Sequence, residues 1–93
     1  MRRIYKYPLI VTDGDGTIEL PKNYRLLKVS TQDGMHLTMW ALVDPDAEDF
    51  EVFVYRIVGT GHDFEDYDEY KYFDTVQMPT GLVWHVFGKP RDR

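Results

Sequence analysis

Apolar and polar residues alternate with a period of two along several short segments of the chain. In an extended strand, such alternation places every second side chain on one face of a sheet. Turn-forming residues interrupt these segments at short intervals, at residues 13–16, 33–34, 44–46, 59–61, 79–81 and 88. The pattern therefore predicts an all-β fold: a small antiparallel β-sandwich or partly open barrel of about 6 to 7 strands, with little or no helix.

The clearest local prediction is a β-hairpin at Asp33-Gly34, a dipeptide that favours a tight turn between strands. The strand before the turn covers residues 24–31 and places Leu27 and Val29 on one face. The strand after it covers residues 35–43, and its alternation predicts four buried side chains: Leu37, Met39, Ala41 and Val43.

Other segments are also predicted as strands. Residues 3–11 form an edge strand, because Pro8 has no amide hydrogen to donate to a neighbour. Residues 50–58 are apolar on both faces, which is typical of a central strand. Residues 17–20 form a short strand, and residues 70–78 and 82–87 form a second hairpin around Pro79-Thr80-Gly81. Residues 44–49 favour one short helical turn, and residues 13–16 a hairpin loop.

The composition suits a single β domain over residues 1–93: hydrophobic residues make up 43% of the chain and aromatic residues 15%. No cysteine is present, so disulfides and thiolate metal sites are excluded. The start of the chain lacks the apolar stretch of a signal peptide, and no run approaches the roughly 20 apolar residues of a membrane span. We therefore expect a soluble, cytoplasmic protein that does not bind membranes.

Charge is unevenly distributed. Residues 1–43 hold six Lys or Arg and four Asp or Glu, giving +2, whereas residues 44–93 hold five and twelve, giving −7. A chain with a net charge of −5 is a poor ligand for duplex nucleic acid, because duplex affinity depends on neutralising phosphates. The negative charge favours binding to a basic surface of a partner, or it only maintains solubility.

Residues 9–17 resemble the first motif of haloacid-dehalogenase-type phosphatases, in which Asp13 would be the nucleophile and Asp15 a general acid beside magnesium. That family needs a helix crossover after this motif, whereas Ile18-Glu19-Leu20-Pro21 follows here. The same carboxylates supply only a fragment of a calcium-binding loop. The histidines also lack zinc-ligand spacing. We therefore expect no enzyme activity, no metal and no cofactor.

A glycine-containing loop follows the strongest strand. Its glycines could direct amide groups at a small anionic ligand, and a neighbouring aromatic ring could stack on that ligand. The candidate ligand-binding residues are Gly59, Thr60, Gly61, His62, Trp40, Trp84 and His85. The alternative is a structural corner. Trp84 and His85 must face opposite sides of their strand, so one of them belongs to the core.

The next segment mixes five acidic and two aromatic residues. Such a segment could bind a basic protein surface, with Arg or Lys as the partner's residues. The candidate partner-binding residues are Asp63, Phe64, Glu65, Asp66, Tyr67, Asp68 and Glu69. The alternative is a solvated loop with no partner.

Several blocks of the chain resemble a family of small uncharacterised proteins that recurs in tailed bacteriophages and prophages. These blocks are residues 3–7, 17–21, 40–44, 59–62 and 83–87. The resemblance implies a phage origin and a location in the cytoplasm of the infected bacterial host. It favours a binding protein that counters a bacterial defence, either by sequestering a small nucleotide-type signal or by blocking a host defence protein.

The alternative to such a counter-defence protein is a structural or assembly protein of the phage that binds no ligand. A pocket on so small a chain forms most easily between subunits, so we also expect a homo-oligomer.

Overall fold

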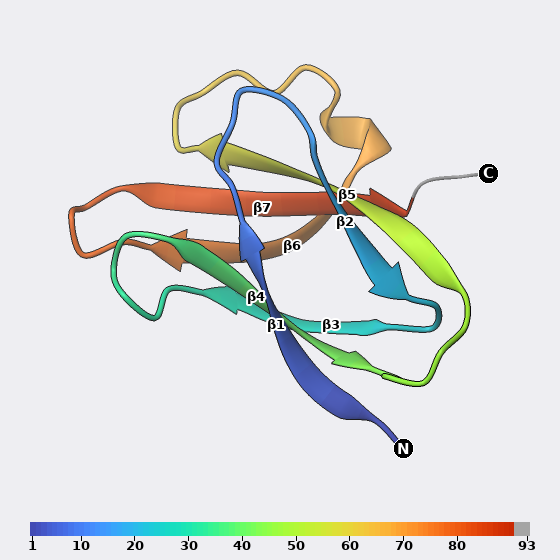
Figure 1. Ribbon diagram of the computed structural model, residues 1–93. Coiled ribbons are helices and arrows are strands. Elements are labelled where there is room, and N and C mark those ends of the chain that lie inside the picture. The colour runs from blue at the N-terminus through green and yellow to red at the C-terminus, as the bar shows by residue number, and fades with distance from the viewer. Residues whose placement is uncertain (91–93) are drawn as a thin grey trace.

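The computed structural model describes residues 1–90, and its seven strands form two antiparallel sheets that pack face to face (Figure 1). The first sheet has the order β1–β4–β3 and the second β2–β5–β7–β6. The strands are β1 (Arg3–Leu9), β2 (Gly16–Pro21), β3 (Arg25–Ser30), β4 (Leu37–Val43), β5 (Phe50–Gly59), β6 (Lys71–Gln77) and β7 (Val83–Pro90). The sheets do not close into a barrel, so the predicted all-β sandwich is confirmed.

The β3–β4 hairpin is confirmed, and β4 buries every second residue as the alternation predicted. Leu37, Met39, Ala41 and Val43 are each at most 2% exposed. The predicted face of β3 is wrong in part. A β-bulge between Leu26 and Lys28 shifts the register, so Leu26 packs on the core and Leu27 is 43% exposed.

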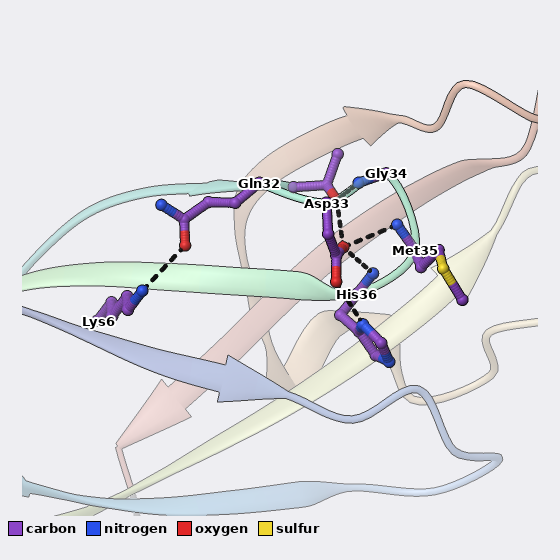
Figure 2. A network of polar contacts seen from close by, with 7 residues as sticks. Lys6, Gln32, Asp33, Gly34, Met35 and His36 are labelled. Carbon is purple, nitrogen blue, oxygen red and sulfur yellow. Dashed lines mark hydrogen bonds and ion pairs between the residues drawn. The ribbon is translucent and has the colours of Figure 1, made fainter.

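The turn of this hairpin is organised by one carboxylate (Figure 2). Asp33 Oδ1 accepts the backbone amides of Met35 and His36, both at 2.8 Å, and Oδ2 lies 2.7 Å from the His36 ring. The Gly34 amide bonds to the Thr31 hydroxyl, and Gly34 has a φ of +78°, which glycine adopts without strain. Asp-Gly therefore specifies this turn through both residues.

The bonds from the His36 ring and from the two amides hold the pKa of Asp33 well below its usual range. A lowered folded-state pKa gives stability above the unfolded pKa of about 3.9, and this stability is lost as pH falls through the folded value. We expect Asp33→Asn, which keeps an amide acceptor but cannot ionise, to lose less stability than wild type between about pH 4 and pH 2. Denaturant unfolding across that range measures the difference; identical acid dependence in both proteins would contradict it.

In the second sheet, β5 lies between β2 and β7, which confirms the predicted central strand. Phe53, Tyr55 and Ile57 face the core. The predicted second hairpin is also present as β6 and β7, with a bulge between Tyr72 and Asp74. This sheet therefore supplies the larger aromatic side chains of the core.

The loop at residues 10–15 is not the predicted hairpin loop. It joins strands of different sheets, because β1 pairs with β4 and β2 pairs with β5. Two hydrogen bonds tie the sheets together: the Ile10 amide donates to the Tyr55 hydroxyl at 3.1 Å, and the Val29 amide to Asp74 Oδ2 at 2.9 Å. The predicted edge position of β1 is confirmed.

The predicted helical turn at residues 44–49 is wrong. A single β-turn occurs there, in which the Ala47 amide bonds to the Asp44 carbonyl. The one short 3-10 helix among residues 1–90, η1, covers Tyr67–Glu69. None of the helical structure in residues 1–90 is long and apolar enough to cross a membrane.

Candidate functional site

The predicted ligand loop forms a β-turn at the end of β5. The His62 amide donates to the Gly59 carbonyl at 3.0 Å, and Gly61, the third residue of the turn, has a φ of +88°. The Thr60 amide donates to the Val83 carbonyl at 3.3 Å and extends the pairing with β7. Two of the loop amides are thus bonded inside the protein, and a ligand here would be held mainly by side chains.

The side chains of this loop are also engaged. A Cβ atom on Gly59 would lie 2.9 Å from the His62 ring and 3.3 Å from Trp84, so only glycine fits beneath them. Thr60 Oγ1 lies 2.8 Å from His85 Nε2, and His85 Nδ1 lies 3.1 Å from Thr75 Oγ1. The loop is a well-packed corner, and its role as a ligand site stays a prediction.

Two hollows of roughly 300 Å³ adjoin this corner and share the side chains of His62 and Trp84. One lies over residues 81–83 of the neighbouring turn. The other is also lined by Asp13, Arg56 and Asp63. The two carboxylates make this second hollow unfavourable for an anion, because Arg56 already pairs with Asp15.

The structure separates the two tryptophans. Trp84 packs against the core, while His85 bonds on the opposite face of β7, as the strand geometry predicted. Trp40 lies on β4 in the other sheet, between the buried residues Met39 and Ala41, so its ring faces outward. Trp40 lines neither hollow at the glycine corner.

The predicted partner-binding residues, 63–69, are here named the acidic loop, and the loop is anchored on the second sheet. The Phe64 ring meets the rings of Phe87 and Tyr70 at centroid distances of 4.9 and 5.3 Å. The Arg56 guanidinium lies 5.6 Å from the centre of the Phe64 ring. Phe64 is therefore an internal anchor of the loop.

Asp15 fixes the far end of this loop. Its Oδ1 accepts the Tyr70 hydroxyl at 2.6 Å and Arg56 Nε at 2.8 Å. Burial raises the pKa of Asp15, but the bonds from Tyr70 and Arg56 outweigh it and leave this pKa lowered. Burial, together with the bond to Asp15, raises the pKa of Tyr70 to about 12. Asp15, which the phosphatase-like motif suggested as a general acid, thus links the β1–β2 loop to Tyr70. Tyr70 is the residue that directly follows the acidic loop.

Anchoring leaves the remaining side chains of the loop in solvent. Tyr67 is 65% exposed. Its acidic neighbours are all exposed: Asp63, Glu65, Asp66, Asp68 and Glu69. Only Glu69 has an ion-pair partner among the described residues, Lys89 at 3.5 Å. The loop presents an aromatic ring within a fixed acidic surface, next to the β1–β2 loop in Figure 1.

Within residues 1–90, no group of three or more His, Asp or Glu side chains is arranged to hold a metal ion. The exposed carboxylates and the Tyr67 ring of the acidic loop can bind through charge and aromatic contact. The sequence indicated these exposed residues, but the anchoring by Phe87 and Asp15 is a long-range contact without a local signal.

Comparison with known proteins places the chain in one family. The family model described as a domain of unknown function, DUF7352, matches residues 1–93, so the chain belongs to this family. No curated protein and no solved structure matches it.

Proposed function

We propose that this DUF7352 protein is a non-catalytic binding protein that blocks a basic surface of another protein with its acidic loop. The observation that carries this proposal is the packing of the Phe64 ring against the rings of Phe87 and Tyr70, which anchors the loop. The anchor fixes the loop before binding, so less conformational entropy is lost when a partner docks.

The exposed part of the loop has the chemistry that a basic protein surface recognises. Its carboxylates attract Arg and Lys side chains and accelerate association at low ionic strength. Tyr67, which projects among them, offers a ring for contact with an arginine guanidinium. Aromatic residues that become buried in this way often supply much of the binding free energy of an interface.

The geometry favours this mode over sequestration of a small anion at Gly59–His62. Two amides of that corner are bonded internally, and one of the two adjoining hollows is lined by the carboxylates of Asp13 and Asp63. An anion entering that hollow would meet like charge. Our proposal therefore keeps the counter-defence role suggested by the resemblance to phage proteins: a phage or prophage protein that blocks a host defence protein in the cytoplasm.

The test compares two variants that lose the same number of charges. The loop variant carries Glu65→Gln, Asp66→Asn and Asp68→Asn, and the control carries Asp46→Asn, Glu48→Gln and Asp49→Asn, three exposed acids of the β4–β5 turn. A protein captured from the infected host is identified by mass spectrometry and purified, and its affinity for each variant is measured. We expect the loop variant to bind about tenfold or more weakly and the control to bind like wild type.

Equal loss in both variants would show a nonspecific charge effect and would contradict the proposal. A phage structural protein would instead occur in purified particles at a fixed copy number, and its recovery there would favour that alternative.

A further inference from the structure

The outer face of the first sheet carries a charge opposite to that of the acidic loop. Strand register places nine side chains on this face in three rows of three. We call them the basic face: Ile4, Leu42 and Arg25; Lys6, Trp40 and Lys28; Pro8, Thr38 and Ser30. Three of the nine are cationic and none is acidic.

Trp40 is the centre of the basic face. Lys6 of β1 and Lys28 of β3 are its direct cross-strand neighbours, one on each side. Adjacent strands are about 4.8 Å apart, so two long cationic side chains flank one indole ring. The β3 bulge helps to produce this arrangement, because it brings Lys28 to the outer face opposite Trp40.

Both lysines remain available to a ligand. Lys6 Nζ donates to the neutral Gln32 side chain at 3.1 Å, as Figure 2 shows. Lys28 is 65% exposed, and its ammonium lies 4.0 Å from Asp74, at the outer limit of an ion pair. The Asp74 carboxylate is also fixed by the Val29 amide. Lys28 therefore has one long ion pair and a largely exposed side chain, and Lys6 bonds to a neutral amide.

We propose that the basic face binds single-stranded nucleic acid, with one base stacked on Trp40 and the flanking phosphates on Lys6 and Lys28. An aromatic ring on an open sheet accepts the face of any base, and cations on either side meet the backbone. The occupant is a single strand because a duplex hides its bases and requires many phosphate contacts, which a net charge of −5 opposes. This site is distinct from the acidic loop and does not depend on the protein-blocking function.

The experiment measures fluorescence anisotropy of a labelled oligothymidylate of about eight nucleotides in about 20 mM salt. The double variant Lys6→Gln, Lys28→Gln should bind about tenfold more weakly than wild type, and its salt dependence should fall by about 0.7 per lysine in a log–log plot. Trp40→Leu should weaken binding about fivefold to hundredfold through the lost stacking. The control is Lys71→Gln, which removes one exposed lysine of the second sheet, outside the basic face, and should bind like wild type.

Circular dichroism confirms that each variant is folded, and the two exposed lysines keep the test decisive if Trp40→Leu unfolds. The proposal is overturned if wild type does not bind, if the double variant binds like wild type, or if Lys71→Gln loses as much affinity as the double variant. A duplex of equal length that binds as tightly would reduce the effect to charge alone. Competition by octaglutamate as strong as that by the oligonucleotide would assign the face to an acidic protein.

Discussion

Replacing Gly88 with alanine is expected to destabilise the protein by about 2 to 3 kcal/mol and to lower its melting temperature by about 10 to 20 °C. The Phe53 ring lies directly over Gly88, in the space that a Cβ atom would fill. Phe53 is 3% exposed and belongs to the core, so any movement of its ring disturbs close packing. The added methyl group must therefore displace a core aromatic side chain. Thermal and denaturant unfolding measure the loss.

Gly14→Ala is the matched control for this prediction. Apart from its own chain neighbours, no atom lies within 4 Å of the position that its Cβ would take, so we expect a change within about 0.5 kcal/mol. Phe53→Leu supplies a second check, because a smaller side chain should make Gly88→Ala less costly in the double variant than in wild type. Equal stabilities for Gly88→Ala and Gly14→Ala would show that the ring does not occupy that space.

The sequence predicted those parts of the fold that depend on local pattern. Period-two alternation identified the buried side of β4, and Asp33-Gly34 identified the β3–β4 turn. Apolar residues on both faces of residues 50–58 identified β5 as a central strand. Each of these features is encoded within one segment, so a single sequence is enough to find it.

Features that depend on long-range pairing were missed. The Leu27 bulge breaks the alternation of β3 without glycine or proline to mark it. Residues 13–16 have hairpin chemistry, yet they connect two sheets, since β1 and β2 find their partners at β4 and β5. A turn motif specifies a change of direction, whereas the choice of neighbouring strand depends on the whole core.

The candidate sites also combine features that are visible in the local sequence with features that depend on long-range contacts. Acidic residues around Tyr67 were evident from composition, but the fit of Phe64 against Phe87 depends on folding. Trp40 was noticed as an aromatic residue, while its lysine neighbours come from strands on either side. Alternation in β4 already indicated that Trp40 faces away from Met39. With the register known, the same rule identifies a charged face of the protein.

Replacing Phe64 with alanine is expected to destabilise the protein by about 2 kcal/mol and to release the acidic loop. The substitution removes ring contacts with Phe87 and Tyr70 and the contact with Arg56. Hydrogen exchange should accelerate at the amides of Glu69 and Tyr70, which donate to carbonyl groups of the acidic loop. Tyr67→Ala is the control, because that side chain is 65% exposed and should contribute little to stability.

Phe64→Ala also separates the effect of loop order on binding affinity from the effect of loop charge. Phe64→Ala keeps every carboxylate, so any loss of affinity for the basic partner protein must come from ordering the loop during binding. We expect affinity to fall about tenfold, equivalent to about 1.4 kcal/mol of ordering cost. Unchanged affinity together with faster amide exchange would mean that charge alone attracts the partner. Unchanged exchange would mean that Phe64 does not hold the loop, and the argument from a fixed acidic surface would then fail.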